Sequence, residues 1–249
     1  NNATNDGDST GLVATDGTLT IQNNTFSQNS VGLKLDSAGG SHSFTVSNNT
    51  FTDNALEAID VNSVFPTFSG NTAENNGTNG ILYQGSISQN YSFVANLPYK
   101  ISTGLSVNAS TTLTLTAGTI LKFTNSGSLT IQGQLTAVGT SANKIIFTSI
   151  KDDLYGGDTN NDGVTTTATS SDWGGIHLSN ATATSTISNA IVSYGTTGLK
   201  LTNSSAILDA ITFLKNALGI QAIGTATTSA SNIVFDGNTT DDDPASLIP

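Results

Sequence analysis

A short phrase recurs along this chain at a nearly constant interval. It reads NNTFSQNSVGLKL at residues 23–35 and NNTFTDNALEAIDV at residues 48–61, and its spacing returns in Phe213, Asn216 and Gly219. Elsewhere, apolar and polar residues alternate in short runs such as LTLT and LTI, which is the pattern of half-buried strands. A period of about 20 to 25 residues built from short strands indicates a β-solenoid.

The repeat predicts an all-β chain in which each coil contributes a few strands and stacks on the next. Equivalent positions then lie about 4.8 Å apart along the axis. Apolar residues fill a continuous interior, and a turn Asn can hydrogen-bond to its counterpart one coil away. We expect roughly ten coils of about 20 to 26 residues, with one long acidic loop at residues 151–172. Leucine-rich repeats share the period, but their L-x-x-L-x-L framework is missing, and a globular β-sandwich remains the alternative.

Composition narrows the classes of partner. The 249 residues include no Cys, and 7 Lys+Arg (all of them Lys) against 18 Asp+Glu give a formal net charge of −11. Such a chain lacks the basic side chains that neutralise nucleic-acid phosphates or attract an anionic membrane surface. No apolar run approaches the length of a membrane span. We therefore expect no nucleic acid and no membrane insertion.

The same composition bears on location. An excess of Thr, Ser and Asn, the absence of Cys and Met, and the acidity suit an extracellular or cell-surface protein. The chain begins Asn-Asn-Ala and shows no signal peptide. We expect a processed product or a segment of a longer polypeptide.

Two stretches of the chain resemble a known group of proteins. One is the phrase at residues 23–35 and 48–61. The other is residues 97–178, which open with LPYKISTGLSVNASTTLTLTAGTILKF and close on DWGGIHL. Both are similar to the right-handed parallel β-helix, or pectin-lyase-like, repeat proteins of bacterial and archaeal surfaces. The resemblance implies that fold but no single function, because the architecture hosts lyases, hydrolases, adhesins, autotransporter passengers and filament subunits.

The order of these stretches has an implication for domain organisation. In the resembling proteins, LSVNASTTLTLTAGTILKF usually opens a β-helix, yet here it follows three coils. The resemblance therefore implies two tandem units. Residues 1–86 would be the last coils of a first β-helical unit, and residues 87–249 a second unit that carries the acidic loop.

The acidic loop concentrates oxygen ligands suited to calcium. The D-x-N-x-D-G spacing is the one with which calcium loops surround a hard cation, and Gly163 makes the sharp turn. The Glu that would close an EF-hand is replaced by Thr169, so other carboxylates of the loop would have to complete the site. A structural calcium site is the prediction, and a solvated acidic loop is the alternative. The candidate ligands are Asp152, Asp153, Asp158, Asn160, Asp162, the Val164 carbonyl and Asp172.

Residues outside this loop receive simpler interpretations. Trp173, directly after the loop, is predicted to pack on the edge of the core rather than to stack against a sugar. The acidic cluster of Asp236 and residues 241–243 is predicted to be a surface turn in a strand-poor tail. Asp6 and Asp8 are a candidate remnant of another loop.

The chain has few of the side chains that carry out catalysis in the resembling enzymes. The resembling lyases commonly abstract a proton with an arginine, and this chain has none. The resembling hydrolases pair clustered carboxylates with a histidine, whereas His42 and His177 stand apart from any Asp pair. We therefore expect no enzymatic activity.

The function that the sequence favours is a non-enzymatic extracellular structural or adhesive module, part of a longer surface protein or filament, with a calcium-stabilised loop. Its expected partners are neighbouring copies or adjoining segments of the same protein, through the end coils. Surface polysaccharide is a second expected partner. The alternatives are a polysaccharide-binding or polysaccharide-degrading lyase or hydrolase, and an ice-binding solenoid that uses Thr arrays.

Overall fold

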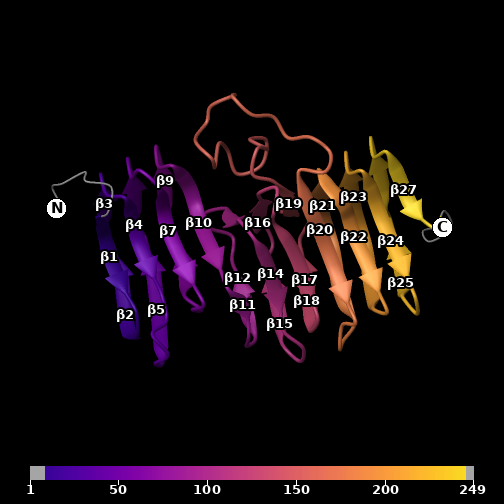
Figure 1. The fold of residues 1–249 in the computed structure, drawn as a ribbon, viewed down its shortest axis with the longest axis horizontal. Helices are drawn as coiled ribbons and strands as arrows, with labels where there is room; N and C mark the ends of the chain where they lie inside the picture. Colours follow the sequence, from indigo (N-terminus) through magenta and orange to yellow (C-terminus); the bar gives the residue numbers. More distant parts are fainter. Residues whose placement is uncertain (1–8, 245–249) are drawn as a thin grey trace.

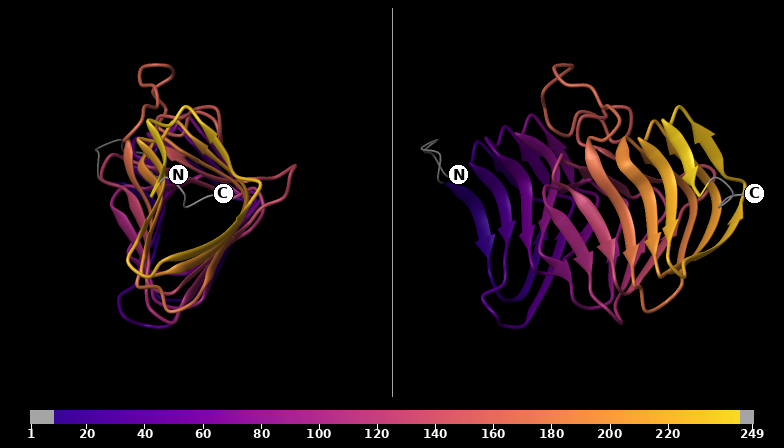
Figure 2. Two further views of the ribbon diagram at one scale, coloured as in Figure 1. Left: turned by 90° about the vertical axis from the view of Figure 1, so that its right-hand side faces the viewer. Right: turned by 45° about the vertical axis from the view of Figure 1, so that its right-hand side comes forward.

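The computed structural model describes residues 9–244 as a right-handed parallel β-solenoid of about 11 turns without helices. Figure 1 shows the turns stacked from the N-terminal to the C-terminal end, and the end-on view in Figure 2 shows a roughly triangular cross-section from which one loop projects. The predicted fold class is confirmed, whereas Asp6 and Asp8 lie outside the described residues. Nothing helical in residues 9–244 is long and apolar enough to cross a membrane.

The largest sheet covers one face along the whole rod and then bends onto a second face. The first face consists of β1 (Thr10–Ala14), β4 (Val31–Leu35), β7 (Glu57–Asn62), β10 (Thr78–Gln84), β13 (Tyr99–Ile101), β16 (Ile120–Phe123), β19 (Ile145–Ser149) and β26 (Val234–Asp236), together with the C-terminal halves of the long strands β21 (Ser185–Ser193) and β23 (Ser205–Leu214). The N-terminal halves of β21 and β23 continue the second face of β12 (Tyr91–Phe93), β15 (Thr112–Leu115), β18 (Gln134–Val138) and β25 (Thr227–Ser231).

Three further sheets complete the rod. The third face of the C-terminal coils consists of β11 (Ser86–Ile87), β14 (Gly104–Val107), β17 (Ser128–Ile131), β20 (Trp173–Ser179), β22 (Gly195–Thr202), β24 (Leu218–Ile223) and β27 (Thr240–Asp243). The N-terminal coils carry two short sheets instead, namely β2 (Gly17–Gln22), β5 (His42–Ser47) and β8 (Thr67–Ser69), and β3 (Thr25–Ser27), β6 (Thr50–Thr52) and β9 (Thr72–Glu74).

Alternating sequence becomes a stacked core because strands of successive turns pair in parallel and in register. Every second side chain along a strand points inward, and it packs on the equivalent inward side chain of the next turn. One column of interior side chains crosses the whole rod. All of its members are buried except those at its two ends, Leu12 and Phe235, which are half-buried. It consists of Leu12, Leu33, Ile59, Ile81, Tyr99, Leu121, Phe147, Val192, Phe213 and Phe235.

The turn Asn residues form the hydrogen-bonded ladders that the repeat predicts. Asn29 donates from its side-chain Nδ2 to Oδ1 of Asn54 at 3.0 Å, and Asn54 donates in the same way to Asn76 at 2.7 Å. Each Oδ1 also accepts the backbone N–H of the Asn one turn earlier, at 3.0 Å in both cases. These amides are buried, so the ladder satisfies polar groups that water cannot reach.

The recurring phrase occupies different faces in the two halves of the rod. In the N-terminal coils its second apolar strand supplies the long interior column, through Leu33 and Ile59. In the C-terminal coils the first strand of the phrase supplies that column, through Phe213 and Phe235. The phrase has therefore moved by one face, and the change falls where β11 and β12 begin. The division into two units at residue 86 stays a prediction, but the cross-section changes at that point.

The prediction of a surface turn for Asp236 and residues 241–243 is wrong. Asp236 is the last residue of β26 and pairs with Leu214. Residues 241–243 are also in a strand. They lie in β27, which pairs with β24 through Ile220 and Asp242, and not in a surface turn. Asp has a low preference for strands, which hid the element. The backbone pairs with β24 nevertheless, and the Asn ladder continues just before the strand, where Asn216 donates to Asn238 at 3.1 Å.

Replacing Asn54 by Ala should lower the free energy of unfolding by about 3 kcal/mol, because buried donors and acceptors on both neighbouring turns lose their partners. Urea unfolding followed by circular dichroism measures the change. Asn24→Ala is the matched control, since Asn24 is exposed at the start of a ladder and its loss should cost about 1 kcal/mol or less. Equal losses for the two variants would show that the ladder amides are not what stabilises the turns.

Candidate metal centre

The acidic loop leaves the rod between β19 and β20 and returns through Trp173. The Trp173 ring stacks on Phe123 with centroids 4.1 Å apart, and its indole N–H donates to the Ser193 carbonyl at 2.7 Å. Trp173 is 1% exposed. The prediction that it packs on the core is therefore confirmed, and the loop ends at a rigid point.

Asp172 holds the C-terminal end of the loop to its beginning. Its carboxylate accepts from Lys151 Nζ at 2.9 Å, from the Ser149 hydroxyl at 2.8 Å and from the Thr169 backbone N–H at 3.0 Å. Burial by itself raises the pKa of Asp172, but the hydrogen bonds from Lys151, Thr169 and Ser149 outweigh it and lower the pKa. This carboxylate is ionised and fully engaged.

A buried lysine organises the first half of the loop. Lys122 projects from β16, is 0% exposed, and donates from Nζ to the carbonyl oxygens of Asp152 at 2.7 Å and Gly157 at 2.6 Å. Burial lowers the pKa of Lys122 to about 8, although the nearby carboxylates of Asp152, Asp153 and Asp158 oppose that shift. The loop is thus wrapped around an ammonium group that belongs to the core.

Three of the predicted ligands converge beyond this lysine. Asp153, Asp158 and Asp162 each offer a carboxylate oxygen, and these oxygens lie within 4.8 Å of one another. Asp158 also accepts the backbone N–H groups of Asp162 at 3.1 Å and Gly163 at 2.8 Å. Those two bonds close a tight turn. Gly163 has φ +68° there, a conformation that glycine adopts without strain because it has no Cβ.

Two oxygens in this cluster are buried without a partner. They are Oδ1 of Asp153 and Oδ1 of Asn160, although each residue as a whole is half-exposed. The Asn160 amide is oriented by donating to Asp162 at 2.6 Å. The pKa of Asp153 is raised, first by burial and then by the charge of Asp158. Carboxylates that repel one another beside an unpaired amide oxygen form a set of donors that a hard cation would satisfy.

The dimensions of the cluster suit calcium. Calcium binds oxygens at about 2.3 to 2.6 Å, so two oxygens on one ion lie no more than about 5 Å apart. The separations within 4.8 Å meet that limit. Asp153, Asp158 and Asp162 are therefore the residues that could hold the ion, and the unpaired Oδ1 of Asn160 is a further oxygen donor in the same loop.

The structure does not bring the other predicted ligands into the cluster. The Asp152 carboxylate accepts from the Thr148 hydroxyl at 2.5 Å and from the Leu154 N–H at 3.1 Å, and Asp172 is occupied by Lys151. The Val164 side chain is 93% exposed, and its carbonyl accepts no hydrogen bond within residues 9–244. Their roles in metal binding stay predictions.

The loop also reaches back to the N-terminal coils, which the sequence did not predict. Asn79, at the start of β10, donates its backbone N–H to the Thr159 carbonyl at 2.8 Å and its side-chain Nδ2 to the Asp158 carbonyl at 3.2 Å. Thr159 is 0% exposed. A Cβ on Gly80 would lie 3.2 Å from Thr159 Cγ2 and 2.6 Å from the Pro98 carbonyl, so only glycine permits this close approach.

The same Asn79 ends an Asn ladder. Its Oδ1 accepts the backbone N–H of Asn76 at 2.8 Å and the side-chain Nδ2 of Asn76 at 3.1 Å. Asn79 thereby takes the place of the next rung above Asn29, Asn54 and Asn76. We call the contact between Asn79 and residues 158–159 the latch, and it joins the last N-terminal ladder rung to the acidic loop.

Comparison with known proteins bears on the fold. Residues 1–98 match the family described as "Right handed beta helix region". The fold of residues 9–244, taken from the structure, is likewise a right-handed parallel β-helix. No curated protein and no solved structure matches it. The matched family includes both enzymes and non-enzymes, and the acidic loop of this β-helix lies outside the matched residues.

Replacing Lys122 by Met should loosen residues 152–158 while the core stays folded, because Met fills the space but cannot donate to the two loop carbonyls. Limited proteolysis should then cut the loop at least about tenfold faster than in the unchanged protein. Lys215→Met is the control, since Lys215 is exposed. An equal cutting rate in Lys122→Met and the control would show that the ammonium does not order the loop.

Proposed function

We propose that this β-helix is a non-enzymatic extracellular structural or adhesive module, in which a calcium ion bound by residues 153–162 fixes the acidic loop across the rod. The ion would be held by Asp153, Asp158, Asn160 and Asp162, and it would have a structural role. A second candidate function, binding or degradation of polysaccharide, stays open because the fold supports both enzymes and non-enzymes.

The observation that carries the proposal is the position of Asp158. Its carboxylate belongs to the cluster, while its own carbonyl and that of Thr159 accept from Asn79. A cation that orders Asp158 would therefore also order the latch. The latch lies where the recurring phrase moves by one face, so it would stiffen the rod at its change of cross-section.

The placement of the other polar groups supports a structural role over a catalytic one. Among residues 9–244 the acidic group close enough to hold a metal is Asp153, Asp158 and Asp162, and neither histidine belongs to it. His42 on β5 stacks on Phe44 and Phe65. His177 on β20 lies 3.2 Å from the Gly174 carbonyl, and its pKa is lowered chiefly by burial.

An ice-binding function receives less support. It would need outward Thr residues repeated at one face on every turn. The column of Thr114, Thr136 and Thr186 is such an array over three turns, but the next residue in register is Ile207. The array is therefore short.

The partner that we propose for the ends is another copy or an adjoining segment of the same protein. The outer edges of β25, β26 and β27 pair with no strand in residues 9–244, and such open edges favour pairing with further chain. β27 carries residues 241–243, all Asp. Stacking of an identical acidic rod on this edge would therefore need cations to offset the repulsion.

Calcium should raise the thermal unfolding midpoint by about 5 to 10 °C at a hundredfold excess over Kd, relative to chelator. Asp158→Asn and Asp162→Asn should remove that shift, since each takes one negative charge from the cluster. Circular dichroism during heating measures it. In the same samples, hydrogen exchange at the Asn79 amide should slow when calcium is present, because that N–H forms the latch.

Asp53→Asn is the control for these variants. Asp53 is an exposed carboxylate in a turn with φ +55°, a conformation that Asn tolerates well. It should keep the whole calcium response. If calcium shifts neither the midpoint nor the exchange of Asn79, the loop is a solvated acidic surface and the calcium part of the proposal is wrong.

A further inference from the structure

The second face of the rod is interrupted at one place. β8 is the last strand of its three-stranded sheet and β12 is the last strand of the path through β21, β18 and β15, and no ladder joins the two in residues 9–244. They nevertheless belong to successive turns. At the adjacent corner Asn71 donates to Asn96 at 3.0 Å, so the turns stay in contact there although no ladder joins β8 to β12.

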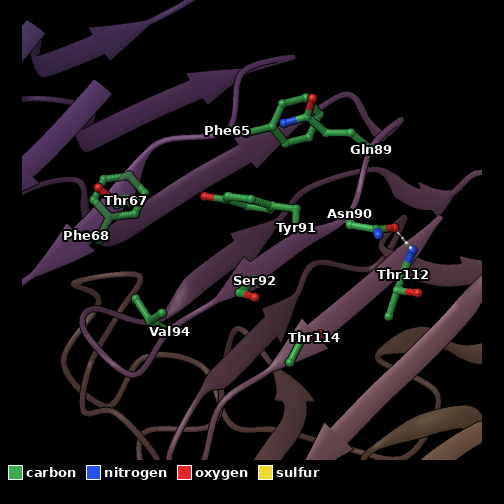
Figure 3. Close-up of a pocket in the computed structure, with 10 residues that line it drawn as sticks. All are labelled: Phe65, Thr67, Phe68, Gln89, Asn90, Tyr91, Ser92, Val94, Thr112 and Thr114. Carbon is green, nitrogen blue, oxygen red and sulfur yellow. Dashed lines mark hydrogen bonds between the residues drawn. The ribbon is translucent and has the colours of Figure 1, made fainter. Parts of the chain in front are cut away.

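A groove of about 550 Å³ lies between the two strands. Figure 3 shows Tyr91 lying across its middle, with Phe65 on one side and Ser92 on the other. Phe65 and Tyr91 are both half-buried, and their ring centroids are 5.2 Å apart at an interplanar angle of 65°. Two aromatic surfaces at a steep angle therefore face the opening.

The aromatic surfaces are held in place by the core. The Tyr91 hydroxyl donates to the Pro66 carbonyl, and the ring stacks on Tyr83 with centroids 6.1 Å apart. Tyr91 also meets Phe93 edge-on at 5.5 Å. A ligand would find these rings already oriented, which lowers the entropic cost of binding.

The rim of the groove supplies neutral hydrogen-bonding groups. Gln89 and Asn90 are exposed on the segment that leads into β12. Asn90 Oδ1 accepts from the Thr112 N–H at 2.9 Å, which leaves its Nδ2 without a partner among the described residues. The Gln89 amide and the hydroxyls of Ser92 and Thr114 likewise have no partner within residues 9–244.

No charged side chain lines this groove, although the chain carries a net charge of −11. The opening thus has aromatic faces, amides and hydroxyls without any fixed charge. A sugar ring has the matching chemistry, since its C–H face packs on an aromatic ring and its hydroxyls bond amides at the edge. An anionic polysaccharide would gain nothing from the groove and would be repelled by the acidic rod.

A peptide fits less well. An extended peptide that added a strand here would have to pair with the edges of β8 and β12. The Tyr91 side chain crosses that gap to reach Pro66. An added strand would have to displace this side chain, whereas a ligand in the groove would lie against it.

We propose that the groove between β8 and β12 binds an uncharged polysaccharide, with one sugar ring on Phe65 and Tyr91 and its hydroxyls on Gln89 and Asn90. The chain would continue from the groove over Ser92, Thr114 and Thr136, which stand in register on successive turns. The spacing of turns, about 4.8 Å, is close to the length of one hexose unit. This site deepens the polysaccharide alternative under the proposed function and is independent of calcium.

The test is affinity electrophoresis of the whole chain through gels that contain soluble neutral polysaccharides, namely glucomannan, xyloglucan and mixed-linkage β-glucan. Polygalacturonate serves as the anionic comparison. At least one neutral polymer should retard the protein and polygalacturonate should not. Phe65→Ala should weaken the binding about tenfold, because it removes one aromatic surface. Gln89→Ala should weaken it about threefold.

The controls separate binding from folding. Tyr155→Ala removes an aromatic ring from the acidic loop, and Gln132→Ala removes an exposed amide elsewhere, so both should bind normally. Gln89 is exposed, and its variant should fold even if Phe65→Ala does not. No retardation by any neutral polymer would overturn the proposal, as would equal retardation by polygalacturonate or undiminished binding in both groove variants. The calcium-dependent unfolding midpoint would be unaffected by any of these outcomes.

Discussion

In-register stacking of successive turns is the constraint on which this structure depends. A parallel ladder places each residue next to its equivalent one turn away. When the same residue type recurs at that position, each copy is stabilised by contact with the copies on the neighbouring turns. Buried Asn residues illustrate the effect. Alone, Asn54 would be a costly buried amide, but between Asn29 and Asn76 it satisfies both neighbours and they satisfy it.

The same constraint explains why the regular stacking is disturbed near β11, where the recurring phrase moves by one face. When the recurring phrase moves by one face, the turns on either side no longer offer matching neighbours. The consequences appear in two places. One strand pair, β8 and β12, stays unjoined and leaves a groove. One Asn ladder loses its next rung, and Asn79 fills that position while holding the acidic loop. Both unusual features of the surface thus originate in a single irregularity of the repeat.

Prediction from the sequence succeeded where the role of a residue follows from its spacing to residues nearby in the chain. The period predicted the solenoid and its ladders, and the alternation of Asp158, Asn160 and Asp162 identified residues that the fold does place together. It failed where a contact joins distant coils. Lys122 looks like any strand lysine, and Asn79 precedes its partner Thr159 by a whole series of turns. Nor could it find β27, because three Asp residues contradict strand preference and the strand forms through its pairing with β24, one turn away.

The acidic loop contains two groups of oxygen atoms that need a positive charge nearby. A lysine of the protein neutralises the first group, at the base of the loop, but not the second, at its tip. Backbone carbonyls of Asp152 and Gly157 point inward, and the Lys122 ammonium bonds both. That ammonium is then committed to carbonyl oxygens, and no positively charged side chain in residues 9–244 hydrogen-bonds the Asp153 and Asn160 oxygens that lack partners. Lysine orders the base of the loop, whereas its tip keeps three converging carboxylates. A divalent ion is the simplest group that could neutralise the tip without disturbing the base, which is why we propose a separate cation for the tip.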